Sequence, residues 1–521
     1  MSAATRLMSA GAHLDREYRK SVIRELVQAR FRMVPPAYGY DTVAVLAHAL
    51  AARRLRRQQV WGSLIGAGVG YVLIADGVFT RPVGILLISW CAWSLAYLRR
   101  IATLQTLIME LKPRNGGGRA VNGAYPHTPG LKAELVDKIA RQQVSHTGLV
   151  RYGGFDPFVG AGLLTDSWST AELVKPAGPD ALVDVVAGRT SEQNGAGPDQ
   201  REVRAVVPFD VRELTGFVEH RMRSVLRDHA ASDQRINTLI VERRRYQRAI
   251  TVGRVRRRRF RKAVRVAEEL PDTGRGMFGD THWEEDADAA REYLCVRVGS
   301  WDQELVTTCF TGFDLRGDTL HIEFHSYVLP PIRKSFHLVE YLPDTLGPRV
   351  LVKVAWDMIV YAPSDVVRFS YRQLKRAVRA VFRGKQAEAE AVAEADLDRV
   401  PDTSELRLGR YALLSVDQGA RTSIRELAKE DRYHLFFQYS DKVKYTQIIQ
   451  QQLLESIELF LMEHNVDLSD HRAARSNVLQ GDVYNNHGNA GNMGPGGQIR
   501  EFHSGGGGQP ADNRSPQPQG G

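Results

Sequence analysis

The sequence predicts an α+β protein with N-terminal helices, a two-helix transmembrane hairpin, a cytoplasmic mixed α/β domain, C-terminal helices and a disordered Gly-rich tail. Three observations predict this fold class: two uncharged apolar runs within residues 60–98, strand-like and helix-like segments mixed in residues 148–345, and a Gly, Asn and Pro-rich composition from residue 481. A chain of 521 residues is too long for a single compact core. Its 25% charged and 43% hydrophobic residues exclude end-to-end disorder, a collagen-like repeat and a polytopic transporter.

The N-terminal region is predicted to be helical. Residues 12–33 carry apolar side chains at helical spacing, and Asp41 can cap a second helix that ends at Arg57. The whole chain then divides into N-terminal cytoplasmic helices (1–58), the transmembrane hairpin (59–99), a helical linker (100–147), the cytoplasmic α+β domain (148–345), a C-terminal helical region (346–475) and a flexible Gly/Asn-rich tail (476–521).

The hairpin is predicted from two charge-free runs, Val60–Ala75 and Val83–Leu98. Each is about 16 residues, or roughly 24 Å as a helix, slightly short of a hydrocarbon core of about 30 Å. Residues 76–82 form the turn between them. The alternative is a buried hairpin in a soluble core, but such long charge-free runs are rare in soluble helices, so we favour spanning.

Arginines at the two ends of the hairpin predict its orientation. Only Arg81 lies in the turn, whereas six arginines flank the runs on the other side: Arg53, Arg54, Arg56, Arg57, Arg99 and Arg100. The positive-inside rule therefore puts both termini in the cytoplasm, with two membrane spans between them. The first run begins about 60 residues into the chain and is followed by a second, which is unlike a cleaved signal peptide.

Gly62, Gly66 and Gly70 recur at every fourth position and so share one face of the first helix. Small residues let another helix approach closely in a membrane, which predicts a helix-packing face. Packing within the hairpin is the favoured interpretation, and self-association into a homo-oligomer is the alternative.

Strands are predicted in the next region from alternating or β-branched runs. They cover residues 149–152, 181–187, 202–207, 238–241, 293–298, 305–311, 319–328 and 335–341. A helix is expected to start at Phe209, with Asp210 as its cap. Further helical segments are expected at residues 350–361, 365–382, 386–397 and 441–464.

The glycine-rich stretch from Tyr152 to Gly162 is the candidate ligand loop. Its glycines and proline among aromatic residues predict a tight loop that could cradle a ligand, although it lacks the Lys-Ser/Thr ending of a phosphate loop. A purely structural loop is the favoured alternative. The candidate residues are Tyr152, Gly153, Gly154, Phe155, Asp156, Gly160 and Gly162.

Neither a metal nor a cofactor is predicted. His321 and His325 lie four residues apart on an expected strand, about 13 Å, which is too far to share one ion. Cys295 and Cys309 could approach from neighbouring strands, but buried thiols are commonly small hydrophobic residues. Because no catalytic motif is present, the catalytic residues stay unknown and enzyme activity stays uncertain.

A basic cluster in residues 243–265 contains 12 Lys and Arg residues and no acidic ones, within a chain of net charge +10. Anionic lipid headgroups are the favoured partner, since the protein is expected to be tethered to a membrane. The alternatives are nucleic acid, which we consider unlikely without a nucleic-acid fold, and a solvated helix paired with acidic residues 284–288. The candidate lipid contacts are Arg254, Arg256, Arg257, Arg258, Arg259, Arg261 and Lys262.

Several motifs together resemble a known group of proteins. They are the Tyr152–Gly162 loop followed by Trp168, the segments Ala420–Glu426 and Tyr433–Gln438, and the asparagine- and glycine-rich tail. In these the chain resembles uncharacterised two-helix membrane proteins of high-GC Gram-positive bacteria. The resemblance implies the membrane topology and nothing catalytic.

The favoured function is a non-enzymatic interaction, sensing or scaffold module held at the inner membrane, with unknown protein partners. A membrane-tethered enzyme or ligand-triggered effector that uses the glycine loop is the first alternative. A membrane-anchored nucleic-acid binder is the second.

Overall fold

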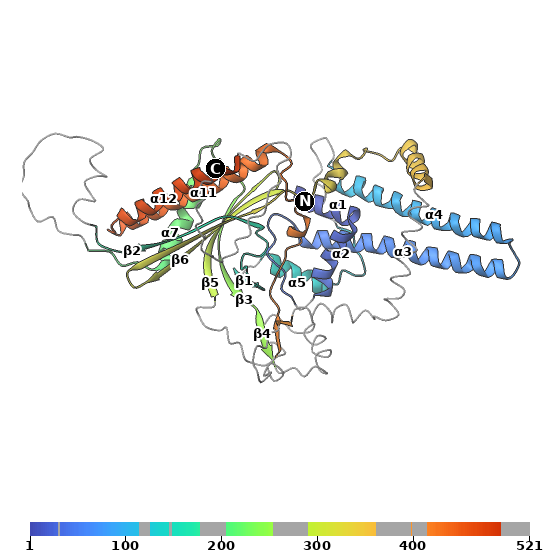
Figure 1. Cartoon of the computed structure of the whole chain (residues 1–521), viewed down its shortest axis with the longest axis horizontal. Helices are drawn as coiled ribbons and strands as arrows, with labels where there is room; N and C mark the ends of the chain where they lie inside the picture. The colour runs from blue at the N-terminus through green and yellow to red at the C-terminus, as the bar shows by residue number, and fades with distance from the viewer. Residues whose placement is uncertain are drawn as a thin grey trace, which may run out of the picture. The chain divides into compact units, whose positions relative to one another are not determined.

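The computed structural model describes residues 1–29, 32–113, 125–144, 148–177, 205–253, 290–360, 397–398 and 414–490 (Figure 1). The chain divides into two compact units, residues 1–468 and 469–521. The first unit is a mixed α+β structure with N-terminal helices and a six-stranded sheet, as the sequence predicts. The second unit contributes helix α12 (Ser469–Ala490).

The N-terminal segment forms two helices, α1 (Ala3–Leu14) and α2 (Arg16–Ile23), and a π-helical turn, η1 (Arg24–Gln28). The single helix predicted over residues 12–33 is wrong, because Asp15 leaves the helical conformation. The Asp15 carboxylate accepts the backbone N–H groups of Glu17 at 2.8 Å and Tyr18 at 3.3 Å and so caps α2. These helices pack around a core that also includes residues of α3 (Thr42–Ala75), α5 (Ala133–Val144) and η2 (Leu107–Leu111).

Helices α3 and α4 (Arg81–Thr106) form an antiparallel hairpin (Figure 1). Nearly all of the first eleven residues of α3 are buried, whereas every residue from Arg53 to the end of the helix is exposed or half-buried. One helix among the described residues, Arg81–Leu111, is long and apolar enough to cross a membrane. That α3 also crosses stays a prediction.

The six-stranded sheet has the order β1-β3-β5-β6-β7-β2. Only β1 and β3 run parallel, and the other neighbours are antiparallel. The strands are β1 (Leu149–Tyr152), β2 (Leu163–Leu173), β3 (Leu239–Arg248), β5 (Ala290–Ser300), β6 (Leu305–Arg316) and β7 (Thr319–Leu329). A small sheet pairs β4 (Ile250–Gly253), β9 (Leu414–Asp417) and β8 (Leu397–Asp398).

Two helices cover one face of the six-stranded sheet. They are α7 (Val211–Arg223), which is followed by the π-helical turn η3 (Ser224–Asp228), and α11 (Phe436–Glu463). The helix starts predicted near Phe209 and Asp441 correspond to these two. The opposite face carries the cluster that holds the glycine loop.

Two elements differ from the sequence prediction. Strand β2 was not predicted because polar residues occupy both of its faces, with Trp168 stacking on Phe324 on the covered side. Residues 335–341, predicted as a strand, belong to the 3-10 helix η5 (Lys334–Tyr341), since Phe336 and Val339 are buried at a three-residue spacing.

The remaining predictions concern the C-terminal third and the residues outside the described ranges. Residues 348–360 are helical as expected, and a short 3-10 helix, η7 (Glu426–Ala428), precedes α11. Helix α12 continues to Ala490, fifteen residues into the region predicted to be flexible. Four predicted segments lie outside the described residues: the strand at 181–187, the helix at 365–382, most of the helical stretch at 386–397 and the tail beyond residue 490. The strand predicted at 202–207 is described only in its second half, and that half is not a strand.

Candidate functional site

The structure brings together the two most distinctive soluble motifs of the sequence, the glycine loop and the segment 417–426. Tyr152 and Ala420 form a parallel bridge, in which the N–H of Ala420 donates to the Arg151 carbonyl at 3.0 Å. The N–H of Gly153 donates to the Ala420 carbonyl at 2.8 Å. A Cβ atom at Gly419 would overlap the backbone of Tyr152 and Gly153, so this contact requires glycine.

The carboxylate of Asp417 holds the first half of the glycine loop. Its Oδ2 accepts the N–H of Gly154 at 2.9 Å and the guanidinium of Arg421 at 3.0 Å, and its Oδ1 accepts the N–H of Gly419 at 3.0 Å. A Cβ atom at Gly153 would overlap this carboxylate. Gly154 has φ +84°, a conformation that favours glycine.

The carboxylate of Glu426 holds the second half of the loop. Its Oε1 accepts the N–H groups of Gly160 at 3.1 Å and Gly162 at 3.3 Å, and its Oε2 accepts the N–H of Ser423 at 2.7 Å. Burial raises the pKa of Glu426, although the three backbone donors oppose this shift. The two carboxylates therefore come from the end of β9 and from the segment that follows it.

These contacts bear on the predicted ligand loop, because its glycine N–H groups are already used. Gly153, Gly154, Gly160 and Gly162 donate to a carbonyl or to a carboxylate of the same chain. An anionic ligand would have to displace Asp417 or Glu426 to reach these donors. The geometry thus favours the structural interpretation of the loop and makes it part of the fold.

The tip of the loop places Phe158 in an aromatic cluster on the sheet. Its ring lies 4.2 Å from that of Phe310, centroid to centroid, and between 5.1 and 5.4 Å from four more rings. Those four belong to Tyr246, Tyr293, His325 and Tyr327. Asp156 accepts the N–H of Phe158 at 2.9 Å and the hydroxyl of Tyr327 at 3.3 Å. Phe155, in contrast, is fully exposed.

Beside this cluster, Glu323 of β7 gathers polar side chains on the same face of the sheet. It accepts the hydroxyl of Tyr293 at 2.8 Å, and its carboxylate lies 3.3 Å from His321 and 3.5 Å from Arg291. Burial lowers the pKa of His325, two residues further along the strand. Sequence reasoning missed this row, because its members come from different strands and only the sheet register brings them together.

The cysteines do not form a joint site. Cys309 pairs with Val296, so Cys295 and Cys309 point to opposite faces of the sheet. Burial raises the pKa of Cys295 to about 11 and that of Cys309 to about 12, which keeps both thiols protonated. Within the residues that the structure describes, no group of three His, Cys, Asp or Glu side chains could hold a metal ion.

The first part of the basic cluster lies on strand β3, which differs from the solvated helix considered above. Arg244 is buried, donates to the hydroxyl of Tyr38 at 3.0 Å and pairs with Glu242 at 2.6 Å. Arg243 pairs with Glu219 of α7 at 2.7 Å. The candidate lipid contacts Arg254 to Lys262, and the acidic residues 284–288, lie outside the described residues.

The glycine face of α3 packs against α4. A Cβ atom at Gly62, Gly66 or Gly70 would meet a side chain of α4: Leu95, Cys91 and Ile88, respectively. Close approach within the hairpin therefore occupies this face. The self-association alternative stays untested.

Comparison with known proteins gives a single finding. No curated protein and no solved structure matches the chain. The model of the AbeC-like domain family matches residues 167–494, which is more than half of the chain and runs from β2 to beyond α12. The glycine loop and the hairpin precede the matched region, whereas the carboxylates that hold the loop lie within it. The chain belongs to the AbeC-like domain family.

Proposed function

We propose that this protein is an inner-membrane protein anchored by the α3–α4 hairpin, with an α+β module on the cytoplasmic side that binds a partner or senses a signal. The observation that carries this proposal is the exposed apolar surface of the hairpin. Large apolar side chains there have exposed fractions between 42% and 71%: Trp61, Leu64, Ile65, Val69, Tyr71, Val72, Val78, Val83, Ile85, Leu86, Leu87, Trp90 and Leu98. A contiguous apolar surface of this kind is unfavourable in water.

The ends of the hairpin support a crossing with both termini in the cytoplasm. Arginines flank its base, and Arg81 alone lies at its turn. Trp93 and Tyr97 stack at 5.4 Å near the base, where aromatic side chains favour the membrane–water interface. Each helix satisfies its own backbone hydrogen bonds, as a bilayer requires.

A binding or sensing role is supported by the architecture of the module. The row around Glu323 presents polar side chains on the face of the sheet that α7 and α11 leave uncovered. Anionic headgroups for the cluster at residues 254–262, and a homo-oligomer, remain predictions of the sequence.

Topology can be tested by single-cysteine labelling in intact cells. In a Cys91→Ser background, Thr80→Cys lies in the exposed turn and Asp233→Cys in an exposed turn of the module. A membrane-impermeant thiol reagent should label Thr80→Cys in cells whose outer membrane is permeable to it, and Asp233→Cys only after lysis. Protection of both sites until lysis would show that the hairpin does not cross.

A further inference from the structure

Residues 348–360 form a helix that lies beside α4 of the hairpin (Figure 1), and part of its exposed surface is apolar. Val352, Trp356 and Ile359 are 68%, 66% and 55% exposed. Their spacing of four and three residues places them on one side of a helix. Arg349 and Lys353 are exposed at the border of the same side.

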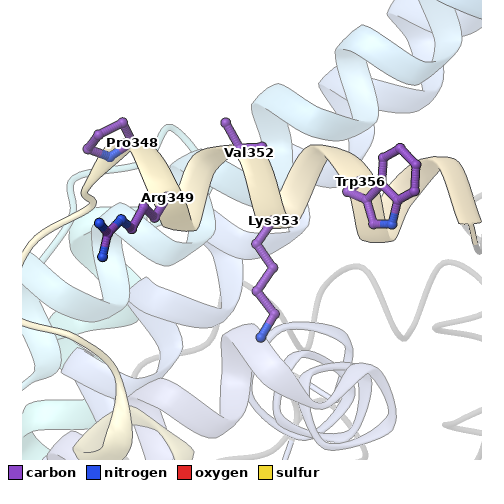
Figure 2. A pocket seen from close by; sticks show the side chains of 5 residues that line it. All are labelled: Pro348, Arg349, Val352, Lys353 and Trp356. Atoms are coloured by element: carbon purple, nitrogen blue, oxygen red, sulfur yellow. The ribbon is translucent and has the colours of Figure 1, made fainter.

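The other side of this helix is half-buried. Val350, Leu351, Val354, Ala355 and Met358 all have intermediate exposure. Both sides of the helix are therefore largely apolar, and the side that carries Val352, Trp356 and Ile359 faces away from the protein. Figure 2 shows Val352 and the indole of Trp356 extending from the ribbon. The side chain of Lys353 extends from the opposite side of the ribbon to Val352 in this view. Together with Pro348 and Arg349 they line an open surface hollow.

Three contacts connect this helix and the segment before it to α4 and to Lys112, the residue after η2. The ammonium of Lys112 donates to the carbonyl of Leu342 and pairs with Asp344 at 2.6 Å, which holds the segment before the helix. The hydroxyl of Tyr97 then donates to the carbonyl of Leu351 at 3.4 Å. Tyr97 belongs to the long helix that could cross a membrane, and Lys112 directly follows its last residue. The exposed apolar face is thus continuous with the base of the candidate span.

We propose that the helix of residues 348–360 lies in the headgroup region of the bilayer, with Val352, Trp356 and Ile359 inserted among the lipid chains beside Tyr97. This inference rests on the proposed membrane anchor and adds a second, interfacial contact to it. About 13 residues span roughly 20 Å, too short to cross, whereas an interfacial helix inserts only its apolar face.

Two of the three charged side chains of this helix fit a lipid surface, because Arg349 and Lys353 are exposed, whereas Asp357 is half-buried. Arg349 and Lys353 flank the apolar side chains, where long basic side chains can reach the phosphate level while their stems stay in contact with lipid. Trp356 has the amphipathic ring that favours this interface. Because the helix is tied to α4 at Tyr97, its insertion would fix the height and tilt of the module above the membrane.

The depth of each position can be measured by spin labelling of the full-length protein in vesicles of phosphatidylethanolamine and phosphatidylglycerol. In a Cys91→Ser background, labels at Val352→Cys and Ile359→Cys should collide often with oxygen and seldom with a water-soluble nickel chelate. Labels on the half-buried side, at Val354→Cys and Met358→Cys, should be less accessible to both reagents. Leu86→Cys, in the candidate span, reports whether the hairpin itself is in lipid.

The outcomes separate the two proposals. Nickel access at Val352→Cys and Ile359→Cys with lipid contact at Leu86→Cys would overturn the interfacial helix and leave the anchor intact. Low access to both reagents on the exposed side would also overturn it, since a second copy or another segment of the chain would then cover this face. Nickel access at all positions, Leu86→Cys included, would refute the membrane anchor as well.

Discussion

Replacing Glu426 tests whether a buried carboxylate fixes the glycine loop. In Glu426→Gln, the amide oxygen can still accept from Gly160 and Gly162, but the amide nitrogen then faces the N–H of Ser423. One buried donor loses its acceptor, which costs about 1–3 kcal/mol. Glu426→Ala leaves all three donors without an acceptor and should cost more.

Hydrogen exchange measured by mass spectrometry on the full-length protein gives a local readout. Since about 1.4 kcal/mol corresponds to a factor of ten, peptides covering residues 417–428 should exchange about 5 to 150 times faster in Glu426→Gln. In Glu426→Ala the peptides covering residues 153–163 should also exchange faster. Asp431→Asn, an exposed carboxylate five residues away, is the matched control and should change neither segment.

The loss of stability in Glu426→Gln should depend on pH in a defined direction. Because burial raises the pKa of Glu426 above 4.5, protonation favours the folded state. The contribution of Glu426 to the stability of the folded state is fully present below the pKa that its carboxyl has in the unfolded chain. This contribution is lost as the pH rises through the pKa that the carboxyl has in the folded protein. The deficit of Glu426→Gln relative to the unmodified protein should therefore be largest in acid and should shrink as the pH rises. Wild-type exchange in both segments of Glu426→Ala, or a deficit that grows with pH, would refute the proposed role.

Three further changes follow from the same structure. Gly66→Leu should separate the hairpin helices and lower the stability of the protein in detergent by about 1–3 kcal/mol. Gly68→Leu is the control and should not do so, because the Cβ position of Gly68 has open space around it. Equal melting curves for the two variants would exclude tight packing at Gly66. Asp417→Asn should cost about 1.5–3 kcal/mol in denaturant titrations, because a charged acceptor is replaced by a group that is half donor; an unchanged midpoint would contradict the clamp. Burial lowers the pKa of His337, but the carboxylate of Glu304, 3.4 Å away, and that of a second glutamate outweigh burial and raise the pKa. His337→Gln should therefore destabilise the protein below about pH 6 and have little effect well above the raised pKa. A pH-independent effect would argue against this pairing.

Much of the sheet could be predicted from the sequence because its strands alternate in polarity. In β7, Ile322 and Phe324 are buried while His321 and Glu323 are half exposed, which is the pattern that predicted this strand. Strand β2 lacks such a contrast, and η5 carries its buried residues three apart, so neither could be recognised from a two-residue period. Hydrophobic periodicity reports burial and not hydrogen bonding, so it fails where both faces are polar.

The candidate site was predictable only in pieces. The glycine loop was singled out by its composition and the segment at residues 420–426 as a motif of the family resemblance, but nothing in either segment indicates that one holds the other. The acceptors Asp417 and Glu426 lie more than 260 positions from the loop, and their roles depend on the bridge between Tyr152 and Ala420. Contacts at such separations follow from tertiary structure and leave no local pattern.

The same contacts determine how the anchor and the module are connected. The sequence predicted a linker over residues 100–147, yet the N-terminal helices and the sheet belong to one compact unit. Tyr40 and Ser423 share a hydrogen bond of 2.7 Å between their hydroxyls, and the Tyr38 ring lies 5.1 Å below the guanidinium groups of Arg244 and Arg297. Burial raises the pKa of Tyr38 to about 12, so its hydroxyl remains neutral between these cations.

This connection has a consequence for any signal that reaches the module. Helix α3 begins in the N-terminal core and continues without a break into the exposed hairpin. That core also contains Ile424 and Ala428, which flank the glutamate that holds the glycine loop. A ligand or partner that displaced the segment 417–426 would therefore disturb the packing at the root of α3. Since a packed core transmits strain rather than dissipating it, the glycine loop and the hairpin are expected to respond to binding as one body.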